Sequence, residues 1–196
     1  MTNIEIIPFV GCSTIKFGMT KAEVEELLGS GQYNMCSHVY PASAKENNPF
    51  PTMEGFYFHS SKNQNINYRI RFSENRVSEI SIYAPENLHK NSVHIQLYGV
   101  DLFENTAETV IAQLEKQSTC TWDSPDKDLS YFYTFHKIGF ELWREGVFHP
   151  KLYNDPEYKK EFDAMCPENQ EYELRFQYFQ LATLRTKELQ ETLFNR

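Results

Sequence analysis

The side chains best suited to catalysis or binding are carboxylates that lie near the two tryptophans in the sequence. These residues are Trp122, Asp123, Asp126, Asp128, Glu141, Trp143 and Glu145. Paired carboxylates can serve as general acid and base in catalysis. Alternatively, an exposed aromatic ring beside carboxylates is typical of a protein interface, in which rings anchor the partner and charges orient it. Burial of each tryptophan in the core is the simpler interpretation.

No pattern that is typical of a catalytic or cofactor site accompanies these acids. The sequence contains no glycine-rich phosphate loop, no HExxH, no GxSxG and no EF-hand loop. None of the six histidines has a second histidine four positions away, and no two of the four cysteines form a CxxC pair. A hydrolase built from Cys36 or Cys120 with any of the histidines, such as His136, is an alternative, but such pairs occur by chance in most sequences. We therefore expect no enzyme activity, no cofactor and no metal.

The charge of the chain is acidic and unevenly distributed. The net charge is −8, and residues 101–170 hold 14 acidic against 7 basic residues. This balance argues against nucleic-acid binding, which needs a basic surface. The acidic segment either keeps the protein in solution or meets a basic protein partner. The sequence has no apolar run of membrane-spanning length and no signal peptide at its start, so we expect a cytoplasmic protein without membrane contact.

Two similar stretches predict helices that would organise these residues. Residues 15–29 read IKFGMTKAEVEELLG, and residues 95–115 read IQLYGVDLFENTAETVIAQLE. Each has a short β-like run, a glycine, a polar cap and an amphipathic helix. The spacing predicts one capping box from Thr20 to Glu23 and another from Asn105 to Glu108.

Alternating strand patterns follow each predicted helix. Tyr68, Ile70 and Phe72 alternate with polar residues, and residues 73–75 are typical of a hairpin turn. After the second helix, strands are expected within 129–146 and 172–184. Period two places Trp143 and Glu141 on the strand face opposite Phe140 and Leu142.

These patterns predict an α+β fold in which a unit of one helix and one antiparallel meander occurs twice along the chain. We expect one domain over 1–196, with a first unit at 12–84 and a second at 93–184. The second unit carries an insertion at 147–171, and a C-terminal helix is expected at 185–196. A lone unit would leave its sheet edges exposed, so the two meanders are expected to form one sheet with the helices on one face.

This arrangement resembles a known group of bacterial proteins. The repeated order of helix, loop and antiparallel strands is similar to the β-lactamase-inhibitor-protein architecture. The phrases IKFGMTKAEVEELLG and YGVDLFENTAETVIAQLE resemble those of small cytoplasmic immunity proteins encoded beside polymorphic and contact-dependent toxins. The resemblance covers residues 12–84 and 93–184 and carries over no catalytic residue. The chain lacks the secretory leader and paired cysteines of secreted inhibitors, which disfavours a periplasmic β-lactamase as target.

The resemblance implies a protein that binds a toxin domain and blocks its active site with the sheet or its loops. Because the tryptophans and the excess acids share the second unit, we expect the seven residues named at the outset to contact the partner. The expected partner is a basic toxin domain, such as a nuclease, whose groove an acidic surface would fit. A non-enzymatic module that binds a small molecule or a peptide on its aromatic sheet face is the alternative.

Overall fold

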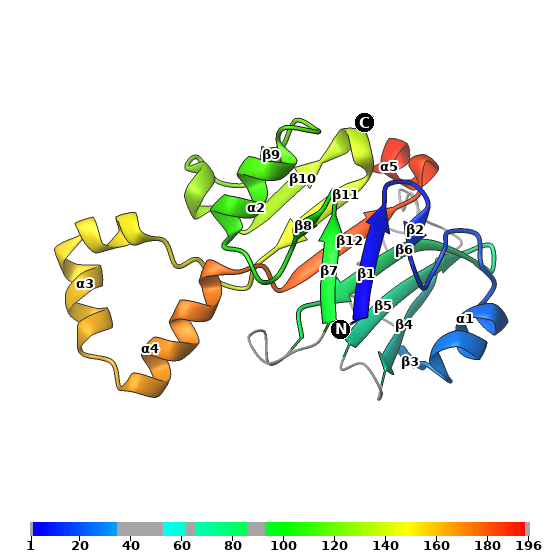
Figure 1. Cartoon of the computed structure of the whole chain (residues 1–196), viewed down its shortest axis with the longest axis horizontal. Helices are drawn as coiled ribbons and strands as arrows, with labels where there is room; N and C mark the ends of the chain where they lie inside the picture. Colours follow the sequence, from blue (N-terminus) through cyan, green and yellow to red (C-terminus); the bar gives the residue numbers. More distant parts are fainter. Residues whose placement is uncertain (1, 35–52, 62–65, 86–92, 195–196) are drawn as a thin grey trace, which may run out of the picture.

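The largest element of the fold is an antiparallel sheet that joins both halves of the chain. The computed structural model describes residues 2–34, 53–61, 66–85 and 93–194 (Figure 1). In spatial order the eight strands are β3 (Gln32–Asn34), β4 (Met53–Ser61), β5 (Ile66–Ser73), β6 (Arg76–Tyr83), β12 (Leu181–Arg185), β11 (Phe140–Trp143), β10 (Phe132–Phe135) and β9 (Thr121–Trp122). The sheet is continuous because β6 and β12, the last strands of the two meanders, pair with Ser81 opposite Thr183.

A second, four-stranded sheet corrects the expectation of a single sheet. Its order is β2 (Gly11–Cys12), β1 (Thr2–Ile7), β7 (Val93–Leu97) and β8 (Val100–Asp101). Strand β1 comes before the first predicted helix and β7 before the second. These two strands pair in parallel, with Ile4 opposite Ile95. The α+β class is confirmed, but the fold has two sheets.

The two helices predicted from the repeat are present, although only one has the expected cap. In α1 (Lys21–Leu28), Glu23 N donates to Thr20 Oγ1 at 3.3 Å and Thr20 N donates to Glu23 Oε2 at 2.7 Å, so this capping box is confirmed. In α2 (Ala107–Leu114), Thr106 is the N-cap residue and its side chain makes no capping bond. The box expected from Asn105 to Glu108 is wrong, because Asn105 Nδ2 donates to the Asp101 carbonyl at 2.9 Å.

The main core lies between the large sheet and the layer formed by the small sheet, α1 and α2. Figure 1 shows this layer in front of the large sheet. Ile4 and Ile95 from the small sheet join Val24 of α1 and Ile111 of α2, each 3 % exposed or less. They pack with the inward side chains of the large sheet, of which Ile80 is fully buried. Burial of so many apolar side chains is the main driving force for this fold.

Two tight turns fix the register of the hairpins. Glu74 and Asn75 join β5 to β6 with φ of 52° and 61°, as expected for the turn at 73–75. Tyr98 and Gly99 join β7 to β8 with φ of 54° and 76°. Two successive positive φ values are typical of the type I′ turn, whose twist matches that of paired strands.

The segment between β11 and β12 forms a helical lobe that projects from the sheets (Figure 1). It contains short 3-10 turns at Pro150–Asn154 and Arg175–Gln177, and the helices α3 (Pro156–Asp163) and α4 (Pro167–Leu174). The strand expected from residue 172 is wrong in its first part, since β12 begins only at Leu181.

The lobe has a small aromatic core of its own, and a final helix follows β12. Phe148, Phe162 and Phe176 form this second core, against which Tyr153, Tyr158 and Met165 pack. The last helix, α5, spans Lys187–Phe194. None of the helices in the described part of the chain is long and apolar enough to cross a bilayer.

Candidate functional site

The candidate site lies on the outer face of the large sheet, which we define as the face opposite the main core. Along β11, Phe140 and Leu142 are buried at 1 % and 0 % exposure, whereas Glu141 and Trp143 are partly exposed. The expected alternation of this strand is therefore confirmed. Trp143 is not a residue of the main core, because the pleat directs its ring to the other side.

Pairing across four adjacent strands places a line of apolar side chains on this outer face. Phe132 of β10 lies opposite Trp143 of β11, Trp143 opposite Leu181 of β12, and Leu181 opposite Tyr83 of β6. We call these residues the aromatic row. Phe132 is 43 % exposed, and the other three are partly exposed. The rings of Phe132 and Trp143 lie 6.2 Å apart at 44°, within the range of favourable aromatic contacts.

A charged network lies beside the aromatic row on the same face. Arg185 Nε donates to Glu79 Oε2 at 2.9 Å, and Arg185 Nη2 lies 3.3 Å from Glu141 Oε1. Burial alone would lower the pKa of Arg185, but Glu79 and Glu141 raise it above its ordinary value. Ser81 of β6 and Thr183 of β12 lie between this network and the aromatic row, and their hydroxyl oxygens are 3.0 Å apart. The position of Glu141 is therefore fixed by its ion pair with Arg185. The network also links β6, β12 and β11, the strands that carry three residues of the aromatic row.

The acidic loop that follows Trp122 is built into the structure more tightly than its sequence indicates. Asp123 Oδ1 accepts hydrogen bonds from the backbone N–H groups of Tyr131 and Phe132 at 3.0 and 3.1 Å. Lys151 Nζ lies 2.6 Å from Asp126 Oδ1 and 2.8 Å from Asp128 Oδ2. The hydrogen bond from Lys151 lowers the pKa of Asp126. These carboxylates connect the loop to β10 and to the lobe.

The seven sequence-predicted residues fall into two groups. Trp143 and Glu141 lie on the outer face, and Glu145 is exposed just beyond β11, where its N–H donates to Gln180 Oε1 at 2.8 Å. Trp122 lies opposite Tyr133 on the edge strand β9, so its ring belongs to the inner side of the sheet. Asp123, Asp126 and Asp128 accompany Trp122 at this edge.

Sequence reasoning missed most of the aromatic row. Phe132 was overlooked because the alternation of Tyr131, Tyr133 and Phe135 marks the other face of its strand, and Tyr133 and Phe135 are indeed buried. Tyr83 and Leu181 come from distant parts of the chain, and only strand pairing brings them together. Phe132 itself was the signal in the sequence, because it is an aromatic residue at a strand position where the alternation predicts a polar side chain.

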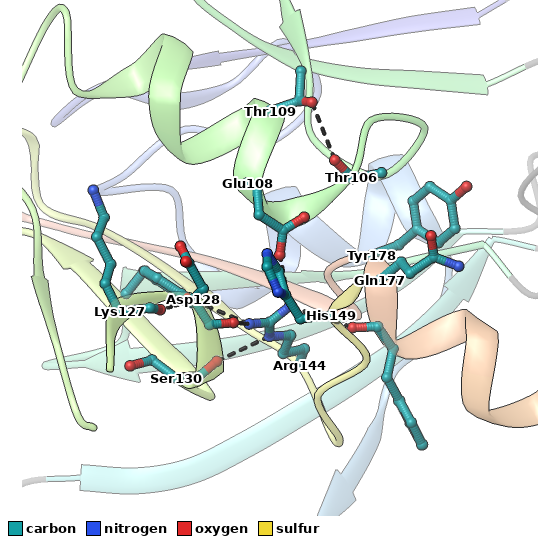
Figure 2. A network of polar contacts seen from close by, with 12 residues as sticks. Thr106, Glu108, Thr109, Lys127, Asp128, Ser130, Arg144, His149, Gln177 and Tyr178 are labelled. Atoms are coloured by element: carbon teal, nitrogen blue, oxygen red, sulfur yellow. Dashed lines mark hydrogen bonds and ion pairs between the residues drawn. The ribbon is translucent and has the colours of Figure 1, made fainter. Parts of the chain in front are cut away.

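Beneath the loop of residues 123–130, a buried arginine organises several elements (Figure 2). Arg144 is fully buried and donates to the carbonyls of Ser130, Asp128 and Phe176, at 2.9, 2.6 and 3.4 Å. Its guanidinium also donates to Glu108 Oε1 at 3.4 Å and to the Tyr133 hydroxyl at 3.1 Å. Every N–H direction of the side chain is used, so Arg144 joins α2, β10 and the lobe.

The geometry gives little support to a hydrolase or a small-molecule site. Burial raises the pKa of Cys120 to about 12, so its thiol is not an activated nucleophile. The other candidate, Cys36, lies outside the described residues. A cavity of about 170 Å³ lies between α2 and the loop, lined by Glu108, Ile111, Ala112, Glu115, Lys127, Asp128 and Tyr133. Sites for drug-sized ligands usually measure about 300–1,000 Å³, so this cavity is too small for one. A larger hollow of about 510 Å³, lined by Pro156, Lys159, Lys160, Asp163 and Ala164 of α3, is shallow and open to solvent.

Comparison with known proteins adds no relative, because no family model, no curated protein and no solved structure matches this chain.

Proposed function

We propose that this protein is an immunity protein that binds a toxin domain through the outer face of its large sheet and occludes the toxin's active site. The aromatic row is the observation that carries this proposal. Tyr83, Leu181, Trp143 and Phe132 form a line of apolar side chains that is not part of the main core. Aromatic residues near the centre of an interface contribute most of its binding energy.

The surroundings of the row support a protein partner. Buried Glu79 and Arg185 hold the partly exposed Glu141 in position, so the strands next to the aromatic row are ordered before the partner arrives. Preorganised side chains lose less entropy on binding, which favours high affinity. Exposed Glu145 follows β11 in the same alternation as Glu141 and Trp143, where it would extend the contact.

The acidic excess of residues 101–170 supports a basic partner. A toxin domain that cleaves nucleic acid has a basic groove, and an acidic protein would be steered toward it. The chain would act in the cytoplasm, where the target of such a toxin lies. No turnover is needed for this function, because a bound inhibitor only has to exclude the substrate.

Co-expression with the toxin tests the proposal. The partner is the C-terminal domain of the large secreted protein that we expect to be encoded immediately upstream. Trp143→Ala and Phe132→Ala should each weaken binding by about 30-fold or more, which corresponds to roughly 2 kcal/mol, the usual threshold of an interface hot spot. Survival of toxin-expressing cells and calorimetric affinity are the two measurements.

Tyr172→Ala is the matched control, because Tyr172 is an aromatic residue with 48 % exposure in the lobe. It should bind and protect like the unmodified chain. A melting curve for each variant separates lost contact from lost folding. Unchanged affinity in both Trp143→Ala and Phe132→Ala would remove the outer face as the binding surface.

A further inference from the structure

A second group of chemically active side chains lies on the small sheet, away from the outer face. His94 is on β7, Asp101 ends β8, and Glu104 lies in the turn before α2. One ring nitrogen and one oxygen from each carboxylate all lie within 4.8 Å of one another. Across the ranges that the structure describes, no other three His, Cys, Asp or Glu residues meet this condition.

The distances between these atoms match those of ligands around one ion. His94 Nδ1 lies 2.9 Å from Asp101 Oδ2 and 3.3 Å from Glu104 Oε2. Two ligand atoms about 2.1 Å from a metal, at angles between the octahedral and tetrahedral values, are roughly 3.0–3.4 Å apart. The two distances from His94 are therefore close to those between metal ligands, and the two carboxylate oxygens lie within 4.8 Å of each other.

The charges of the group also call for a cation. Asp101 and Glu104 place two carboxylates against one imidazole, and neither has a lysine or arginine ion-pair partner in the described chain. The acidic loop differs, because Asp126 and Asp128 share Lys151. Close carboxylates repel each other unless a proton or a cation lies between them. A divalent ion would neutralise the charge of both acids.

The group is preorganised by its neighbours. Asp101 Oδ1 accepts hydrogen bonds from the N–H groups of Phe103 and Glu104, at 3.1 and 3.0 Å. This leaves Oδ2 directed at His94, just as hydrogen bonds from neighbouring groups orient metal-binding carboxylates in other proteins. The side chains of Asp101, His94 and Glu104 are 11 %, 21 % and 36 % exposed, so water can complete the coordination.

We propose that His94, Asp101 and Glu104 bind one divalent transition-metal ion. An imidazole nitrogen with two carboxylate oxygens suits Zn²⁺, Co²⁺ or Mn²⁺ better than Mg²⁺ or Ca²⁺, which prefer oxygen ligands alone. The ion connects the β7–β8 hairpin to the segment that leads into α2. Because the three ligands are brought together only by folding, binding stabilises the native state.

Calorimetric titration of the full chain with Zn²⁺, after treatment with a chelator, tests the site. We expect one ion per chain and a higher melting temperature in its presence. Asp101→Asn and Glu104→Gln should each weaken binding by about tenfold or more. The first variant keeps an oxygen that can accept the two backbone hydrogen bonds, so the turn should persist. Glu74→Gln, which changes an exposed acid in the β5–β6 turn, should bind like the unmodified chain.

Co²⁺ absorption identifies the ligand type. Nitrogen and oxygen ligands give no thiolate charge-transfer band, whereas binding through a cysteine gives one. Three results would overturn the site: no Zn²⁺ binding at millimolar concentration, equal affinity in Glu104→Gln and Glu74→Gln, or a thiolate band. Absence of Zn²⁺ binding would mean that His94 is positioned only by its contacts with Asp101 and Glu104.

Discussion

At the scale of single residues, Arg144 is fully buried and donates five hydrogen bonds. Replacing it with leucine would leave the carbonyls of Ser130 and Asp128 without their donor and Glu108 without its ion pair. Each buried carbonyl left without its donor typically costs about 1–3 kcal/mol, so the two together cost about 2–6 kcal/mol. Glu108, with its side chain 32 % exposed, stays hydrated and adds less. We expect Arg144→Leu to lower the free energy of unfolding by about this amount, measured by urea denaturation.

Arg175→Leu provides the comparison for this prediction. Arg175 is exposed and its guanidinium lies 5.9 Å from the ring centre of Tyr172, so its loss should cost under about 0.5 kcal/mol. Similar unfolding free energies for the two variants would show that the contacts of Arg144 contribute little net stability.

The sequence could predict the direction of a side chain but not its long-range partners. Period two correctly placed Trp143 and Glu141 on the face opposite Phe140, because alternation is a local property of a strand. The contacts of Asp126 could not be predicted, since Lys151 lies 25 positions away. Reversing the loop charges would therefore disturb folding as well as binding, and Glu145 is the cleaner position for a test.

At the scale of elements, the helical lobe is the part that should unfold separately. Its aromatic core of Phe148, Phe162 and Phe176 is distinct from the main core. Phe162 is 6 % exposed, and truncation of a buried phenylalanine costs about 3–5 kcal/mol. We expect Phe162→Ala to raise amide hydrogen exchange across α3 and α4 while β5, β6 and β12 keep their protection.

Tyr172→Ala, at 48 % exposure, should leave the exchange of the lobe nearly unchanged. Loss of protection throughout the chain in Phe162→Ala would mean that lobe and sheets unfold as one unit. The ion pairs from Lys151 to Asp126 and Asp128, and the hydrogen bond from Arg144 to the Phe176 carbonyl, would then couple them.

At this scale, sequence patterns correctly predicted the features that depend on interactions between residues close in the chain. The Thr20–Glu23 capping box closes within one helical turn and was correct. Glu108 was expected to cap α2, but Arg144, 36 positions away, draws its carboxylate instead. Tyr172 and Phe176 fit a strand alternation, yet residues four apart also share a helix face, and their rings meet at 5.2 Å. The small sheet was missed because the parallel pairing of β1 with β7 joins residues 91 positions apart, such as Thr2 and Val93.

At the scale of the whole molecule, the two halves meet so that one face of the large sheet carries the main core and the aromatic row lies on the other. The order β3-β4-β5-β6 continues as β12-β11-β10-β9, and β1 meets β7 in the second layer. Because the small sheet, α1 and α2 contribute to the main core on one side, the aromatic row is left on the other. The outermost strands, β3 and β9, are only three and two residues long, which limits unwanted pairing at the edges.

The charge of the whole molecule should govern how fast the proposed toxin complex forms. The net charge is −8, and residues 101–170 hold 14 acids against 7 bases. Steered association slows as salt screens the charges over about 10 Å at 0.1 M. We expect the association rate constant, measured by stopped-flow fluorescence, to fall by about tenfold or more between low and physiological salt.

Variants separate the contributions of charge and contact to this complex. Glu145→Lys should slow association and reduce its salt dependence, because Glu145 is exposed beside the aromatic row. Glu74→Lys, an exposed reversal in the β5–β6 turn, should have a smaller effect on the rate. Trp143→Ala should instead speed dissociation, since lost contacts act mainly on the lifetime of a complex. Association that is unaffected by salt would remove the electrostatic part of the proposal, whereas a Trp143→Ala complex with faster dissociation would still place the partner on the outer face.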